Sequence, residues 1–318
     1  MLTPIRDSHE SQCPGEGPGD GRPGEGPGGS VFGSGLPAPA LRAVGLLTAW
    51  GSGTTALPVD AVTAAGGRPV LSLTRPAYDR ERLRRVPREC LLGLAAVEAM
   101  LEDARAGREA ISGDRTALVY ASAGSYAASN RLFIDHGSAG AYFPYTAPAA
   151  VPAEAAIEFG ITGPYAIFIG GPVATLRAIW YAATLLESAR CDRVLVLAVE
   201  TFDECVDLYT RGRRLTGHPL VEAAGCLWLE PGEGSLAIES SRRGGRPNRG
   251  GIRQRLGETF ACEPVAALDL WRRDETRPTL CVSGAWGGET VRLWWTAPLA
   301  AANRRQPATP ESGRRHGG

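Results

Sequence analysis

A turn between a short strand and a helix is the place in this sequence best suited to present a reactive group. Residues 165–169, YAIFI, form an apolar run with aromatic and branched side chains between Gly163-Pro164 and Gly170-Gly171, which predicts a buried strand. The turn at the carboxyl end of a strand in a β-α-β unit is a common position for a functional site. In this chain Pro172 occupies that position, and proline has no thiol, hydroxyl or acidic group with which to react.

The elements that position this turn follow directly along the chain. Pro172 suits the first position of a helix, because its missing N–H would be unpaired there in any case. Apolar residues recur at helical spacing through 176–186, which predicts a helix that ends near Ser188 with one stripe facing the core. The continuous apolar run at 194–199 then predicts a strand that is buried on both faces.

Further elements upstream indicate the fold class. We expect strands at 41–49 and 116–121, helices at 88–102 and 153–159, and a loop rich in Gly, Ser and Ala over 122–142. The resulting alternation of strands and helices predicts an α/β layered fold.

The segment around the turn resembles the β-ketoacyl synthases, the condensing enzymes of fatty acid and polyketide synthesis, which have a thiolase-like fold. The residues that carry the resemblance are Gly163-Pro164, Ala174-Thr175-Leu176, Ala178-Ile179, Ala189-Arg190-Cys191-Asp192 and Glu200. Similar patterns upstream, over 143–164, and downstream, over 222–230, extend the resemblance to the region 41–230. It implies a thiolase-like layered fold with a mixed sheet and helices, of which this chain holds the N-terminal half.

The resemblance places the family's nucleophilic cysteine at Pro172. In the family that cysteine carries the acyl group as a thioester, and its backbone N–H helps to bind the oxyanion. Covalent catalysis needs the nucleophile, and loss of one oxyanion donor costs about 2.7 to 4 kcal/mol of transition-state stabilisation. We therefore expect no catalytic residue at this turn, only a candidate residual pocket formed by Gly170, Gly171, Thr175 and Glu200.

The other catalytic residues of the family lie in the second half of its fold, and this sequence does not display them. Ketoacyl synthases use two histidines, or a histidine and an asparagine, and many have a nearby lysine. The sequence contains no lysine, and none of its 4 histidines, His9, His136, His218 and His316, stands in a matching motif. Residues 231–318 are also too few for a second half of ordinary domain size, so we expect the C-terminal half to be truncated.

Other side chains near the turn are weaker candidates for a nucleophile. Cys191 lies in a loop before a strand, where burial or a loop role explains it better than catalysis. Ser122, Ser125 and Thr175 carry hydroxyls, but the sequence places no histidine or acidic partner to activate them. Thr175 falls within the first helical turn, where we expect it to hold N–H groups of the helix.

Two glutamates lie at the ends of buried runs. Glu200 ends one predicted strand and Glu222 precedes the next. Each is either a residual site carboxylate or a structural hydrogen-bonding group. We favour the structural role for both, because a buried charge must find polar partners.

Composition limits the classes of function. The hydrophobic fraction of 43% over 318 residues suffices for one substantial core. The formal net charge of +0 provides no general attraction to nucleic acid. No apolar run is long enough to span a membrane and the first residues do not resemble a signal peptide, so we expect a cytoplasmic protein. The 7 cysteines form no C-x-x-C pair, and we expect neither a metal nor a cofactor.

Composition also divides the chain into segments. Residues 1–40, mostly Gly, Pro, Glu and Ser, and residues 299–318 are predicted to be disordered tails around a ketoacyl-synthase-like domain at 41–238. The Arg/Gly-rich segment 239–258 is either a solvated linker, which we favour, or an RNA-binding segment. We expect a short C-terminal strand remnant at 259–298, with a hairpin within 279–295.

Two classes of function remain. The first is a non-catalytic subunit, similar in role to the chain length factors, that forms a homo- or heterodimer with a ketoacyl synthase, with an acyl carrier protein as a candidate further partner. The resemblance implies an interface formed by Tyr165, Ile167 and Ile169 together with the loop 122–142. The alternative is an acyltransferase or 3-oxoacyl-[acyl-carrier-protein] synthase that acts through another residue or through a partner's second half. A truncated, decaying paralogue is a third option.

Overall fold

The computed structural model describes residues 31–32, 35–135, 143–207, 217–242, 251–274 and 276–296. Most of the two predicted tails, part of the predicted loop 122–142 and the centre of the Arg/Gly-rich segment lie outside these ranges. Within the described part of the chain, no helix is both long and apolar enough to cross a membrane.

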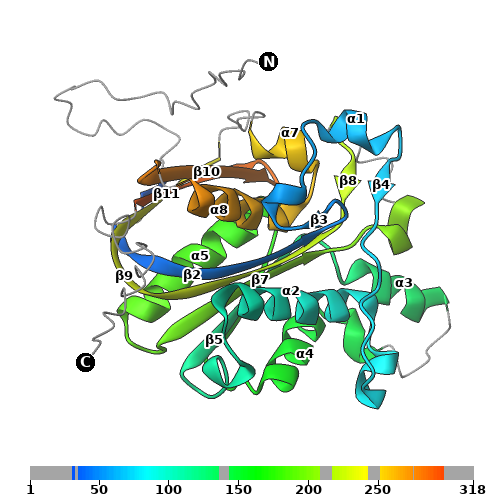
Figure 1. Cartoon of the computed structure of the whole chain (residues 1–318), viewed down its shortest axis with the longest axis horizontal. Helices are drawn as coiled ribbons and strands as arrows, with labels where there is room; N and C mark the ends of the chain where they lie inside the picture. The colour runs from blue at the N-terminus through cyan, green and yellow to red at the C-terminus, as the bar shows by residue number, and fades with distance from the viewer. Residues whose placement is uncertain are drawn as a thin grey trace, which may run out of the picture.

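One mixed sheet forms the centre of the molecule, with the strand order β10-β11-β9-β7-β5-β6 (Figure 1). Strand β5 (Thr116–Ser122) pairs in parallel with β6 (Tyr165–Ile169) on one side and with β7 (Arg193–Glu200) on the other. Strand β7 then pairs antiparallel with β9 (Ala223–Ser241). The parallel strands bring the carboxyl ends of β5, β6 and β7 to one edge of the sheet.

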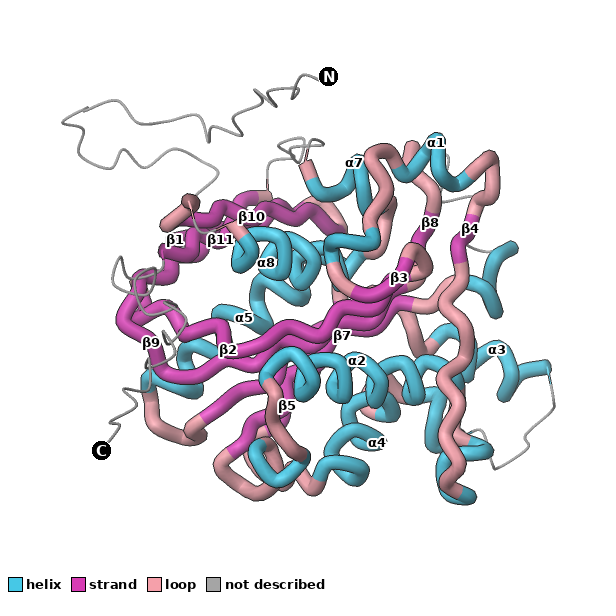
Figure 2. Tube along the Cα trace, viewed as in Figure 1, coloured by secondary structure: helices cyan, strands magenta, loops and turns pink. Residues whose placement is uncertain are grey.

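Helices cover both faces of this sheet, which makes the layered α/β arrangement predicted from the sequence. Helices α2 (Arg88–Ala104) and α4 (Ala150–Phe159) lie on one face, and α5 (Gly171–Glu187) and α8 (Glu263–Arg273) lie on the other (Figure 2). Alternate residues of the central strands supply the two cores: Val196 faces α5, whereas Leu197 faces α2. Burial of both faces explains why β7 is a continuous apolar run.

Strand β9 is long enough to pair with different strands along its two parts. Its first part pairs with β7, and its last part pairs with β11 (Glu289–Thr296), which forms a hairpin with β10 (Thr279–Trp286). Gly287 and Gly288 make the hairpin turn with φ values of 57° and 82°, the conformation that a two-residue turn of this kind requires. The sheet therefore curls around α5 and α8, and the hairpin covers their outer side (Figure 1).

Strand β2 (Leu36–Thr48) corrects one predicted boundary. It begins inside the segment 1–40 that we expected to be disordered, and it pairs with β9 from Leu36 opposite Leu236 onward. The two residues of β1 (Val31–Phe32) pair with β9 as well. A few apolar side chains, such as Ala38, which is 1% exposed, suffice to order this part, and the Gly and Pro around them concealed it.

The segment 239–258 differs in a similar way from the predicted linker. Strand β9 continues to Ser241, past the predicted end of the domain at 238. Helix α7 (Ile252–Leu256) lies within the same segment, and Leu256 is fully buried in the core beside α5. The arginines and glycines dominate the composition of the segment, but its apolar ends pack against the rest of the fold.

The shorter elements connect these layers. They are β3 (Gly51–Ser52), η1 (Thr54–Ala56), α1 (Ala61–Ala65), β4 (Val70–Leu71), η2 (Glu81–Arg85), η3 (Arg108–Ala110), α3 (Ala127–Asp135), η4 (Phe143–Thr146), η5 (Asp203–Cys205), β8 (Leu220–Val221) and η6 (Phe260–Cys262). Strands β4 and β8 form a separate small parallel sheet.

Candidate functional site

The turn between β6 and α5 has the strand-turn-helix form that the sequence predicts. Gly170 and Gly171 adopt φ values of 142° and 53°, which side chains disfavour, and the N–H of Gly170 donates a hydrogen bond to the carbonyl of Ser122. Pro172 follows in the first turn of α5 and is buried. The strand itself differs from the prediction: β6 lies at the end of the sheet, and Tyr165 and Ile169 are 48% and 47% exposed.

The indole ring of Trp286, at the end of β10, lies directly on the two glycines of this turn. A Cβ atom at Gly171 would lie 2.3 Å from Cε3 of Trp286, and one at Gly170 would lie 3.2 Å from Cδ1. The hairpin also approaches the helix, since a Cβ atom at Gly284 would lie 2.6 Å from Cβ of Pro172. Glycine is therefore required at 170 and 171 both for the backbone angles and for the ring above them.

Trp286 is the outer member of a column of three aromatic rings. Its ring centroid lies 5.2 Å from that of Phe260, which in turn lies 5.4 Å from that of Phe202, and both pairs meet edge to face. Trp286 is 40% exposed, whereas Phe202 is 0% exposed. This aromatic column, Phe202, Phe260 and Trp286, runs from the surface into the interior, so the protein's own side chains occupy the space beside the turn.

The backbone that carries Phe260 is held by two of the candidate pocket residues. Thr175 donates its hydroxyl to the carbonyl of Ala261 over 2.5 Å, and the carboxylate of Glu200 accepts the N–H of Ala261 over 3.3 Å. Phe260 has a φ of 45°, an unfavourable value for a residue with a side chain, which surrounding contacts must maintain. Thr175 therefore fixes η6. The prediction that its hydroxyl holds N–H groups of its own helix is wrong.

Glu200 joins the carboxyl ends of β5 and β7 to the same segment. Its carboxylate accepts hydrogen bonds from the backbone N–H groups of Ala123 and Gly124, and the hydroxyl of Ser122 lies 3.5 Å from it. Complete burial raises the pKa of Glu200 to about 8, although these hydrogen bonds act in the opposite direction. The carboxyl group thus connects the loop after β5 with η6.

The two candidate serines also belong to this buried hydrogen-bond chain. Ser122 donates to Ser125 over 3.1 Å, and the Ser125 and Tyr120 hydroxyls are 2.6 Å apart. The structure therefore brings Ser122 to an acidic group, Glu200, which the sequence could not place because 78 positions separate them. Cys191 lies at the other end of α5, about 25 Å along the helix from the turn, and burial raises the pKa of its thiol, which disfavours the reactive thiolate.

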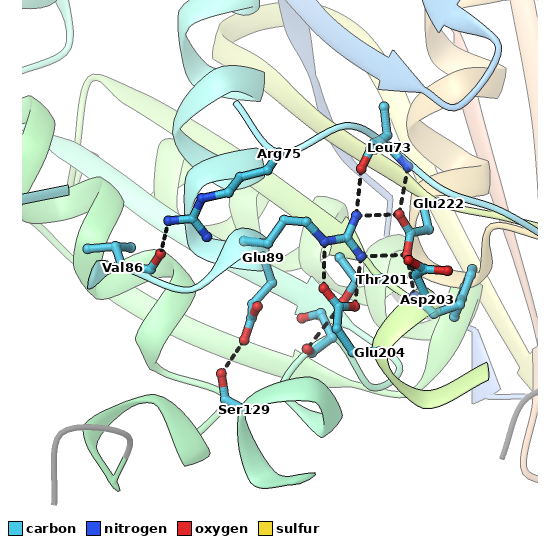
Figure 3. A network of polar contacts seen from close by, with 12 residues as sticks. Leu73, Arg75, Val86, Glu89, Ser129, Thr201, Asp203, Glu204 and Glu222 are labelled. Carbon is cyan, nitrogen blue, oxygen red and sulfur yellow. Dashed lines mark hydrogen bonds and ion pairs between the residues drawn. The ribbon is translucent and has the colours of Figure 1, made fainter. Parts of the chain in front are cut away.

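Glu222 belongs to a second polar group together with Arg88 and Glu204, of which Figure 3 labels the two glutamates. The side chain of Glu222 is fully buried, and those of Arg88 and Glu204 are half-buried. The Arg88 guanidinium binds both carboxylate oxygens of Glu222 over 2.6 and 2.7 Å, and both oxygens of Glu204 over 2.5 and 2.7 Å. We call these three residues the Arg88 network. Sequence reasoning missed Arg88 and Glu204, since nothing in the local pattern pairs residues so far apart.

The Arg88 network fixes the loop that follows β7. Glu222 accepts the N–H groups of Phe202 and Asp203 over 2.7 and 2.8 Å, and that of Leu73 over 2.7 Å (Figure 3). Nearby, Ser129 donates to the buried carboxyl of Glu89, whose pKa is raised by burial. Because Glu222 positions the backbone of Phe202, the network also positions the inner ring of the aromatic column.

The candidate interface residues lie on the outer edge of β6. Among the described strands, β6 pairs only with β5, so the other side of β6 presents unpaired backbone N–H and C=O groups. Tyr165 and Ile169 are the exposed residues at its two ends, and Ile167 between them is half-buried. No group of three or more potential metal-binding side chains occurs in the described part of the chain.

Comparison with known proteins gives a family match over part of the chain. Residues 74–210 match the family model for the β-ketoacyl synthase N-terminal domain. No curated protein matches the chain by sequence.

Solved structures share the fold at low sequence identity. One is a type II polyketide synthase acyl-carrier protein in complex with its ketosynthase bound to the hexaketide, at 14% identity and a TM-score of 0.66, over 83% of this chain and 100% of that chain. The ishigamide ketosynthase/chain length factor matches at 16% identity and a TM-score of 0.61, over 83% of this chain and 99% of that one. A ketosynthase in complex with its chain length factor from Xenorhabdus doucetiae matches at 14% identity and a TM-score of 0.55, over 81% of this chain and 99% of that chain. The predicted resemblance to the β-ketoacyl synthases and the thiolase-like α/β fold are therefore confirmed.

Proposed function

We propose that this chain is a non-catalytic β-ketoacyl-synthase-like subunit that partners an active ketoacyl synthase in fatty acid or polyketide-type biosynthesis, in the cytoplasm. Its role would be similar to that of a chain length factor. The observation that carries the proposal is the aromatic column, which fills the space beside the turn where the family resemblance would place a nucleophile.

The chemistry of the turn supports a loss of catalysis. Pro172 supplies neither a thiol to hold an acyl group nor an N–H to bind an oxyanion. Trp286 lies against Gly170 and Gly171, so an acyl chain entering here would have to displace the ring. The carboxylates nearest to the turn are engaged in positioning backbone segments, as Glu200 does for Ala261.

The exposed edge of β6 supports a partner. On its outer side no described strand pairs with it, the side chains of Tyr165 and Ile169 are exposed, and its sequence contains no charged residue that would discourage strand pairing. Two of the similar solved structures are of ketosynthases with chain length factors, and another contains an acyl-carrier protein, which agrees with an acyl carrier protein as a further partner.

The test is to mix the purified chain with an intact ketoacyl synthase from the same organism and to follow the mixture by size-exclusion chromatography with light scattering. We expect one peak with the mass of a heterodimer. Ile169→Asp places a charge on the edge of β6 and should abolish that peak. Ile157→Asp, on α4 at a position that is 66% exposed, is the matched control and should leave it intact. Two separate peaks for the wild-type mixture would refute the proposed partnership.

A further inference from the structure

Trp286 differs from the other two rings of the aromatic column because a large part of it faces solvent. Its ring covers Gly170, the residue that directly follows Ile169 at the end of β6. Trp286 is 40% exposed and Ile169 is 47% exposed. Trp286 of the hairpin therefore lies at the carboxyl end of β6, against the residue that follows Ile169, although the two elements are far apart in the sequence.

The geometry points to a specific role for this residue: we infer that Trp286 is a contact of the ketoacyl-synthase partner, whose own strand edge pairs with β6 and whose apolar surface covers the exposed side of the indole. The inference rests on the function proposed above and extends its interface from β6 to the hairpin β10–β11. The same side chain then closes the turn within this chain and binds the neighbouring subunit.

The surroundings of Trp286 favour such a contact. The ring is held by Phe260 on one side and by the two glycines beneath it, so little side-chain freedom remains to be lost on binding. Tryptophan is among the residues that most often dominate the free energy of an interface, especially next to a well-packed centre. The turn Gly287-Gly288 has no side chains that would hold a partner's backbone away.

The hairpin is also fixed in position relative to β6. Glu289, the first residue of β11, binds Arg177 of α5 and Ser240 of β9, both over 2.5 Å. Gly284 packs against Pro172 at the start of the same helix. Since β6 leads directly into α5, these contacts hold Trp286 in position relative to the end of β6.

The experiment measures the affinity of the chain for the synthase by isothermal titration calorimetry. Trp286→Ala should weaken binding at least tenfold, and Trp286→Phe should weaken it less. Leu270→Ala, on α8 at a position that is 38% exposed, is the control and should bind as the wild type does. Far-UV circular dichroism confirms that each variant is folded.

Hydrogen exchange on the wild-type chain gives a second measurement that needs no substitution. On addition of the synthase, amide exchange should slow both in β6 and at residues 285–288. If β6 is protected while the hairpin tip is not, and Trp286→Ala binds as tightly as the wild type, this inference is wrong and the proposed partnership stands. If the wild-type chain does not bind the synthase at all, or binds only to itself, both are wrong.

Discussion

The turn at Gly170–Pro172 and the Arg88 network both lie near the ends of strands of the sheet, but the turn is packed by aromatic rings and the network consists of charged groups. The turn is covered by a column of rings from the loop after β7, from η6 and from β10. The network is closed by one guanidinium between two carboxylates. Apolar rings pack the turn, whereas charged groups hold the loop after β7 in place.

Phe202 connects the two regions. Its ring is the inner end of the aromatic column, and its N–H donates to Glu222 of the Arg88 network. The Arg88 network is therefore linked to the aromatic column through the backbone of Phe202. Substitutions in the two regions should therefore lower the free energy of unfolding for different reasons. In the network, removal of one charge leaves its partner unpaired. In the aromatic column, the cost comes from removing a ring or from adding volume beside it.

The largest effect is expected for the charged region. Arg88→Met leaves Glu222 and Glu204 without their cation, and we expect the free energy of unfolding to fall by about 3 to 5 kcal/mol. The control is Arg115→Met, which removes an ion pair to Asp192 whose side chains are 48% and 52% exposed, and it should leave the free energy of unfolding nearly unchanged because water screens such a pair. Urea denaturation measures both. Equal and small losses would show that the Arg88 network does not organise the loop after β7.

A dependence on pH should distinguish Glu200 from an ordinary surface carboxylate. Its pKa is raised from 4.5 to about 8 in the folded chain, so the folded state binds more protons than the unfolded state between these values. The contribution of Glu200 to the free energy of unfolding is therefore fully present at low pH and is lost as the pH rises through this window. The loss amounts to about 3 to 5 kcal/mol, since each unit of pKa shift corresponds to about 1.36 kcal/mol.

Glu200→Gln removes this titration. Chemical denaturation of both proteins from pH 5 to pH 9 should give stability curves that diverge as the pH falls, once their common pH dependence is subtracted. Parallel curves for the two proteins would mean that Glu200 keeps its ordinary pKa and that its burial does not govern its protonation.

A smaller effect is expected from overfilling the turn. Gly171→Ala should destabilise the chain by about 2 to 3 kcal/mol, because the added methyl group meets both an unfavourable φ and the ring of Trp286. Gly66 has a φ of 58° with nothing within 4 Å of an added Cβ, so Gly66→Ala carries only the backbone cost, about 1 kcal/mol.

The contribution of the ring itself comes from a double-mutant cycle. In a Trp286→Ala background, Gly171→Ala should lose about 1 to 2 kcal/mol of its effect and become similar to Gly66→Ala. An unchanged effect in that background would separate Trp286 from the turn and remove the main support for a filled site.

The sequence predicted the elements around the turn well because their signals are local. The strand at 165–169 and the helix that starts beside Pro172 are bounded by Gly and Pro, and the run at 194–199 is continuous, so each lies within a residue or two of its observed position. The early start of β2 was missed for the same reason, since Gly and Pro around Leu36 hid a short apolar pattern.

The filling of the turn was not predictable from local patterns. Phe202 lies in the loop after β7, Phe260 in η6 and Trp286 at the end of β10. Trp286 reaches Phe260 because β11 pairs with the last part of β9, which places the hairpin over α5. The predicted partner of Thr175, a group in its own helical turn, is wrong because the hydroxyl donates to the carbonyl of Ala261, which is 86 positions away. Contacts of this range depend on topology, which a single sequence does not specify.

The most direct test of the proposed function is intact-mass spectrometry of the assembled system. The wild-type chain is combined with an intact ketoacyl synthase from the same organism and an acylated acyl carrier protein, and the mass of each subunit is measured after rapid quenching. We predict that the acyl group appears on the synthase and that the mass of this chain is unchanged. An acyl adduct on this chain would contradict a non-catalytic role and would favour catalysis through a residue other than Pro172.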